Sequence, residues 1–252
     1  MKSVKIFISF LLFVIVFLVG SSVYAASYYV LNGDVNYSGA VDSTDARDIL
    51  RSSIGLLTYT GQRKNLADMD FDRKITSTDA RLALRASVGY NEAYKVFYHA
   101  FVVRDYVISK RYYQAAKTSY GNKCWGFAGI YAKAINTGNT AIIQNNINNG
   151  NNPSGVSMTQ TTGSESTILK AIASQLRARK ACVVQVNGSG DGRHYVVVAG
   201  HRANANLNAL KASDLLLLDV YDGELKPVSG GSRHLFANRA RYGYDYQMFT
   251  VD

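Results

Sequence analysis

Cysteine, proline and tryptophan are scarce in this 252-residue chain, which contains two, two and one of them. So few cysteines exclude the small secreted domains in which a dense disulfide framework replaces a hydrophobic core. No run of four or more Lys or Arg occurs, so the net charge of +10 predicts a solvated basic surface and no nucleic-acid partner. Pro-rich or Ser-rich linkers are also missing, so we expect neighbouring domains to follow each other directly.

Only one long apolar run is present, at residues 6–20, after the short basic stretch of residues 1–5. Small residues then surround Ala25 and Ala26, as at a signal-peptide cleavage site. The run is shorter than the roughly 20 residues that span a bilayer. The pattern predicts an export signal over residues 1–26. After its cleavage we expect a secreted, extracellular protein that is not bound to a membrane; an uncleaved anchor is the alternative.

An internal repeat follows the signal. The stretches GDVNYSGAVDSTDARDILRSSIGL (33–56) and ADMDFDRKITSTDARLALRASVGY (67–90) share STDAR and place oxygen-bearing side chains at positions 1, 3, 5, 9 and 12 of a 12-residue loop. Calcium prefers six to eight oxygen ligands, one of them a backbone carbonyl at position 7. Gly39 supplies the turn at position 6, where the second loop has Arg73. The predicted calcium ligands are Asp34, Asn36, Ser38, Ala40, Asp42 and Asp45 in the first loop, and Asp68, Asp70, Asp72, Lys74, Thr76 and Asp79 in the second.

These two loops, each followed by one helix, resemble a type I dockerin, which we assign to residues 27–91 as a small all-α domain. The resemblance implies two calcium ions and binding to the cohesin module of a scaffold protein, in a cellulosome that degrades polysaccharides. In that family, loop positions 10 and 11 and a basic residue on the following helix contact the cohesin. The matching residues are Ser43, Thr44 and Arg51 in the first repeat, and Ser77, Thr78 and Arg85 in the second.

The remaining residues, 92–252, predict an α+β domain. Apolar spacing favours a helix from Cys124 to about Ile135, and a Ser-Glu start favours a second helix over residues 164–179. Short β-branched and apolar runs at residues 181–187, 194–201, 215–221 and 244–251 predict strands. The fold class is therefore α+β, with a cysteine-bearing helix packed on an antiparallel sheet.

Cys124 is the candidate nucleophile of this domain. A helix N-terminus favours the thiolate, and a thiolate needs a base to take its proton and a third group to orient that base. His194 begins a predicted strand and is the candidate base, and Asp219 at the end of the next apolar run is the candidate orienting acid, with Asp222 as its alternative. A disulfide between Cys124 and Cys182 is the competing interpretation, because the compartment is oxidising.

The stretches NKCWGFAGIYAKAI (122–135), LRARKACVVQVNGSGDGRHYVVVAGH (176–201) and LLLLDVYDG (215–223) resemble papain-fold cysteine peptidases, closest to the double-glycine (bacteriocin-leader) peptidase-like branch. The resemblance implies peptide hydrolysis by a Cys124–His194–Asp219 triad without a catalytic metal. It also implies that Gln114 stabilises the oxyanion, with Asn122 as the competing donor. The alternatives are amide hydrolysis of cell-wall peptidoglycan and a non-catalytic binding module.

Overall fold

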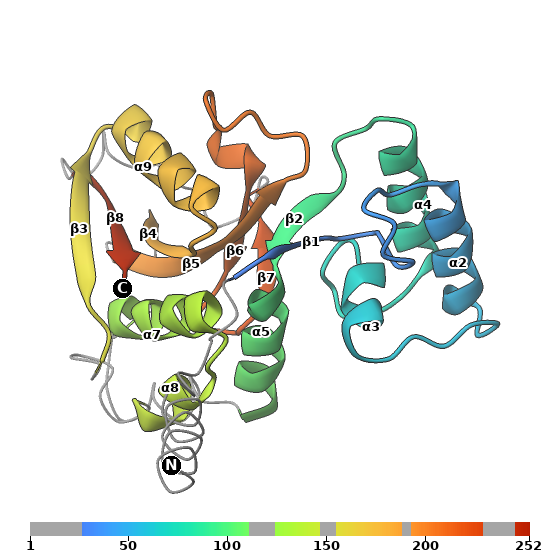
Figure 1. Cartoon of the computed structure of the whole chain (residues 1–252), viewed down its shortest axis with the longest axis horizontal. Coiled ribbons are helices and arrows are strands. Elements are labelled where there is room, and N and C mark those ends of the chain that lie inside the picture. The colour runs from blue at the N-terminus through green and yellow to red at the C-terminus, as the bar shows by residue number, and fades with distance from the viewer. Residues whose placement is uncertain (1–26, 111–123, 147–154, 188–192, 229–244) are drawn as a thin grey trace, which may run out of the picture.

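The computed structural model describes residues 27–110, 124–146, 155–187, 193–228 and 245–252. The predicted export signal over 1–26, Gln114 and its competitor Asn122 lie outside the described residues. The described chain has two parts, a small helical part and a larger part built on an antiparallel sheet (Figure 1). None of the described helices is both long enough and apolar enough to cross a membrane.

The helices and strands alternate irregularly along the chain. The helical part contains α2 (Ser43–Ser53), α3 (Gly61–Ala67) and α4 (Ser77–Ser87). The helices of the larger part are α5 (Tyr98–Lys110), α7 (Cys124–Thr137), α8 (Ala141–Asn145) and α9 (Glu165–Arg177), with a short 3-10 turn at Ala212–Asp214. The strands are β1 (Tyr29–Leu31), β2 (Tyr94–Phe97), β3 (Met158–Gly163), β4 (Cys182–Asn187), β5 (Arg193–Arg202), β6 (Leu215–Leu218), β7 (Leu225–Pro227) and β8 (Tyr246–Val251).

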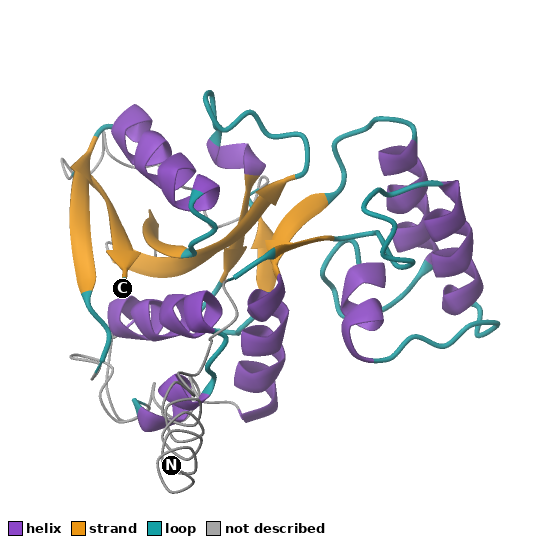
Figure 2. Ribbon diagram, in the orientation of Figure 1, coloured by secondary structure: helices purple, strands orange, loops and turns teal. Residues whose placement is uncertain are grey.

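Strand β5 is central to the sheet. The described strands run in the order β1-β2-β5-β4-β8-β3, while β6 pairs with β5 and β7 pairs with β6. All of these pairings are antiparallel. The residues from Val196 to Ala199 are all buried, so both faces of β5 are covered. Figure 2 shows why: helices α7 and α9 lie on opposite sides of the central strands. The predicted mixture of helices with an antiparallel sheet is confirmed, and the papain-like arrangement stays a prediction.

The helical part is inserted between two neighbouring strands of the sheet. Strand β1 precedes it and β2 follows it, and these strands pair with Tyr29 opposite Phe97 and Leu31 opposite Lys95 (Figure 1). Residues 29–31 therefore belong to the sheet and not to the helical part. They fall within the all-α domain that the sequence predicts over residues 27–91. The difference arises because a three-residue strand is defined by its distant partner and has no local signature of its own.

Candidate functional site

Cys124 is the first residue of α7, and its side chain is buried against β5. The N–H groups in the first turn of a helix have no partners within the helix and are free to donate to a nearby acceptor. Burial raises the pKa of the Cys124 thiol, and hydrogen bonds to the sulfur oppose that rise. They come from the backbone N–H groups of Tyr195, Trp125 and Cys124 itself and from the Tyr221 side chain. Both cysteines are free thiols, so the structure has no Cys124–Cys182 disulfide.

His194 and Asp219 form a buried pair that is connected to this thiol through Tyr221. The imidazole Nε2 lies 3.0 Å from Asp219 Oδ1, and both side chains are almost fully shielded from solvent. Asp219 directly follows β6, whose last residue, Leu218, pairs with Val197 on β5, so the sheet register brings the acid to the histidine strand. If Nε2 carries the proton that Asp219 accepts, Nδ1 is the free basic nitrogen, and it has no hydrogen-bond partner among the described residues.

Tyr221 contacts all three of these residues. Its backbone N–H donates to Asp219 Oδ1 at 2.9 Å, and its ring stacks on the His194 ring with centroids 4.0 Å apart and planes 16° apart. Its hydroxyl reaches the Cys124 sulfur. The sequence interpretation missed this residue. The available signal was an aromatic side chain two positions after the orienting acid, in a turn that has to fold back over the histidine.

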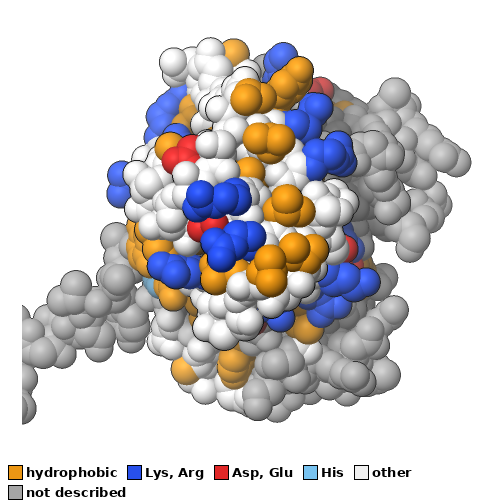
Figure 3. All heavy atoms as spheres, turned by 90° about the vertical axis from the view of Figure 1, so that its right-hand side faces the viewer, with side chains coloured by type: hydrophobic (Ala, Val, Ile, Leu, Met, Phe, Trp, Pro, Cys, Tyr) orange, Lys and Arg blue, Asp and Glu red, His pale blue; other side chains and the backbone are white. Residues whose placement is uncertain are grey.

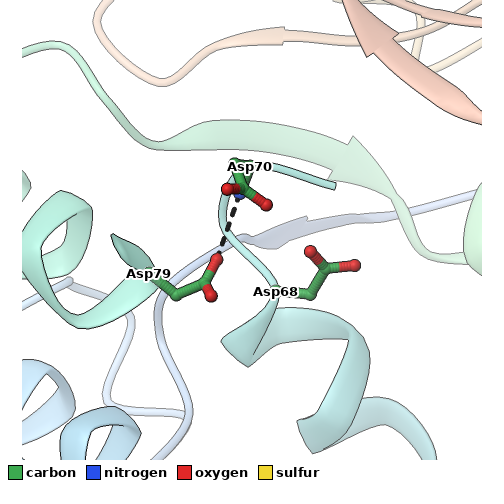
Figure 4. A group of neighbouring side chains, drawn as sticks. All are labelled: Asp68, Asp70 and Asp79. Atoms are coloured by element: carbon green, nitrogen blue, oxygen red, sulfur yellow. Dashed lines mark hydrogen bonds between the residues drawn. The ribbon is translucent and has the colours of Figure 1, made fainter. Parts of the chain in front are cut away.

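The second repeat gathers carboxylates at one point. Carboxylate oxygens of Asp68, Asp70 and Asp79 lie within 4.8 Å of one another (Figure 4). Asp79 Oδ1 is held by the backbone N–H groups of Met69 and Asp70 at 2.7 and 3.3 Å. Asp68 Oδ1 is buried and lacks a hydrogen-bond partner among the described residues. Burial raises the pKa of Asp68 to about 7, although the Arg104 guanidinium lowers it. This set of hard oxygen atoms fits a calcium ion.

The first repeat has the same backbone scheme. Asp45 Oδ1 accepts from Val35 N and Asn36 N at 3.0 and 3.2 Å, as Asp79 does in the second repeat. Position 6 has a left-handed backbone in both loops, with φ of 88° at Gly39 and 72° at Arg73. The loop conformation that the spacing predicts is therefore present even where Arg replaces Gly, at the expense of backbone strain.

The remaining predicted calcium ligands lie along the two loops and bond mainly to loop atoms. Three of these bonds are from Ser38 N to Asp34 Oδ1 and to Asn36 Oδ1, and from Ser38 Oγ to the carbonyl of Ala40. Three others are from Thr44 N to Asp42 Oδ1, from Lys74 N to Asp72 Oδ1 and from Thr76 Oγ1 to Asp79 Oδ2.

The predicted cohesin-binding residues differ between the repeats. Ser43, Thr44 and Arg51 are exposed at the two ends of α2. In the second repeat Ser77 is exposed, whereas Thr78 and Arg85 are half-buried. The Arg85 guanidinium pairs with Glu92 at 2.8 Å and lies 4.2 Å above the Tyr90 ring. Figure 3 shows this end of the molecule, where exposed apolar side chains alternate with Lys and Arg.

Comparisons with known proteins assign one part of the chain. Residues 32–85 match the family model described as dockerin type I domain. No curated protein and no solved structure matches the chain. Dockerin domains bind calcium and cohesin modules and are typical of extracellular proteins associated with cellulosomes. Residues 32–85 are therefore a dockerin type I domain, and they include the two loops whose backbone Asp45 and Asp79 hold.

Proposed function

We propose that the protein is a secreted cysteine peptidase, held on a cohesin-bearing scaffold by its dockerin. The observation that carries the proposal is the continuous contact from Cys124 through Tyr221 to His194 and Asp219. A thiol at a helix N-terminus, a histidine with one free nitrogen and a buried acid on its other nitrogen are the parts that nucleophilic acyl transfer requires.

The proposed reaction has the following steps. His194 Nδ1 takes the proton of the Cys124 thiol, and the thiolate attacks the carbonyl carbon of a peptide bond. The negative charge that develops on the carbonyl oxygen is stabilised by the N–H of Cys124 and by Gln114, whose place in the site is a proposal from sequence. The imidazolium then gives its proton to the leaving amine. Water, deprotonated by His194, hydrolyses the resulting thioester and releases the acid and the free thiol.

The histidine is needed because burial acts against the thiolate. Burial raises the pKa of Cys124, so the thiol alone is neutral at pH 7, and an uncharged thiol is a poor nucleophile. Asp219 stabilises the imidazolium that forms when His194 accepts the proton, and fixes the ring so that Nδ1 remains the basic atom. The pair therefore activates a cysteine that its own surroundings leave inactive.

The test uses the secreted chain with casein and with purified peptidoglycan as substrates. Cys124→Ala is expected to abolish release of peptides from casein, whereas Cys182→Ala keeps it, because Cys182 is buried in the core at the start of β4. Equal casein hydrolysis by the wild type and Cys124→Ala would overturn the assignment. Cleavage of peptidoglycan alone would replace the peptidase with an amide hydrolase. A wild-type Cys124 that fails to react with iodoacetamide would indicate a non-catalytic module.

The dockerin is proposed to bind two calcium ions, one in each loop, and to dock through Ser43, Thr44 and Arg51 or through Ser77, Thr78 and Arg85. Arg51 is exposed and its Nη1 lies 3.8 Å from Asp48, whereas Arg85 pairs more closely with Glu92, at 2.8 Å, and lies above the Tyr90 ring. Arg51→Ala is therefore expected to weaken cohesin binding more than Arg85→Ala does in a calcium-containing pull-down. Equal binding by all three chains would exclude the first repeat as the preferred docking face.

A further inference from the structure

The two calcium loops have the same spacing of oxygen-bearing residues, but the side chains at positions 4 and 6 of the second loop make contacts with the larger part of the molecule. Position 4 of the loop shows the difference most clearly. Tyr37 and Phe71 occupy this position with nearly the same backbone, at φ of 62° and 64°. Tyr37 is 50% exposed, whereas Phe71 is 4% exposed and meets the ring of Tyr94 on β2 edge to face, with centroids 5.7 Å apart.

Position 1 of the second loop contacts the larger part as well. Arg104 extends from α5, is 3% exposed, and places its Nη1 3.8 Å from Asp68 Oδ2. Its Nη2 donates to Asn65 Oδ1 on α3 at 2.7 Å. A buried guanidinium needs such partners, because an unpaired buried charge destabilises a fold strongly. Helix α5 and the second calcium loop therefore share one charged contact.

Position 6 reaches the turn that carries the orienting acid. Arg73 Nη2 lies 3.3 Å from Glu224 Oε1, and the backbone carbonyl of Glu224 accepts from Asp219 N at 3.0 Å. In the first loop, Gly39 occupies this position and has no side chain to make such a contact. The first loop lines an open groove of about 470 Å³ between itself and strands β1 and β2. The Arg-for-Gly replacement thus gives the second loop a contact with the Asp219 turn.

We propose that the second calcium loop is also the interface between the dockerin and the C-terminal part, so that calcium in this loop stabilises the sheet and the Asp219 turn. The ion would fix the backbone of residues 68–79. It would thereby hold Phe71 against β2, Arg73 near Glu224 and Asp68 near Arg104. A ligand that binds only the folded form stabilises whatever folds together with its site. This inference rests on the calcium binding proposed above and is independent of the peptidase activity.

Trp125 makes the inference measurable. It is the only tryptophan of the chain, lies in α7 and meets the Phe249 ring of β8, so its fluorescence reports on the C-terminal part. Thermal unfolding of the full chain is followed by this fluorescence in CaCl₂ and in EGTA. At a calcium concentration about a hundred times the dissociation constant, the midpoint is expected to rise by about 5–10 °C. An identical midpoint in both buffers, with calcium binding seen by titration, would overturn the inference. Titration without any binding would overturn the proposed calcium sites as well.

The repeat supplies matched controls. Asp79→Asn is expected to remove the calcium-dependent rise, and the equivalent change in the first loop, Asp45→Asn, to keep most of it. Asp79→Asn also alters an acceptor of two backbone N–H groups, so it could disturb the loop directly. A second pair of variants therefore leaves the predicted calcium ligands unchanged. Phe71→Ala is expected to bind calcium but to lose the rise in the Trp125 midpoint, whereas Tyr37→Ala keeps it. Equal effects of the two members in either pair would refute the assignment to the second loop.

Discussion

Replacing Tyr221 with Phe tests the proposed site at a single atom. The change removes the hydroxyl that reaches the Cys124 sulfur and keeps the ring that stacks on His194 and the backbone N–H that binds Asp219. A hydrogen bond to a charged group contributes about 1.5–3 kcal/mol. Because about 1.4 kcal/mol corresponds to a factor of ten, we expect thiolate-dependent alkylation at pH 7 to slow by roughly 10- to 100-fold.

The assay is the rate of iodoacetamide reaction with the folded protein between pH 6 and 10. Loss of the hydroxyl is expected to shift the rate profile to higher pH, since it removes one of the contacts that oppose the effect of burial. Tyr221→Leu also removes the stacked ring, which adds about 0.5–1.5 kcal/mol of lost contact with His194. We therefore expect the Leu variant to lose more peptide hydrolysis than the Phe variant does.

Tyr195→Phe is the matched control. Tyr195 follows His194 on β5, and its hydroxyl donates to Gln247 at 2.8 Å. The substitution leaves its backbone N–H, which reaches Cys124, in place. An alkylation profile of Tyr221→Phe that equals those of the wild type and Tyr195→Phe would refute the role of the Tyr221 hydroxyl.

Three further measurements test the site and the sheet. Asp219→Asn is expected to lower the turnover number by about 10²–10⁴, since His194 loses its charged partner. Asp222 is exposed, and Asp222→Asn is expected to leave the turnover number unchanged. Equal turnover numbers of the two variants would exclude Asp219 as the orienting acid. Burial raises the pKa of Cys182 from 9.0 to about 12, so the free energy of unfolding should fall as the pH rises above 9, because only the unfolded thiol ionises there. Urea unfolding at pH 8 and 10 checks this, and the fall should be smaller in Cys182→Ala. Gly200→Ala would push a methyl group into the backbone carbonyl of Lys95 on the paired strand. We expect the free energy of unfolding, measured with urea, to fall by about 1–3 kcal/mol. An unchanged unfolding midpoint would contradict the β2–β5 register.

The helices and strands near the site were largely predictable from local patterns. The helix expected from Cys124 to about Ile135 runs to Thr137, and the strand expected at residues 194–201 spans 193–202. Apolar periodicity and turn residues define such elements within a short window. The expectation that His194 and Asp219 lie close together needed the β5–β6 pairing, which the structure supplies. Tyr221 was missed because its role comes from three contacts and from no motif.

The sequence by itself was enough to assign the dockerin and to predict its two calcium loops, since all the predicted oxygen ligands of a loop come from one 12-residue window and the repeat shows the spacing twice. It also determined which cysteine begins a helix. Only the tertiary structure decided that the dockerin is inserted between β1 and β2, and that its second loop meets β2 and α5. Those contacts join Phe71 to Tyr94 and Asp68 to Arg104, and two loops with the same ligand spacing acquire different surroundings only when distant strands pair.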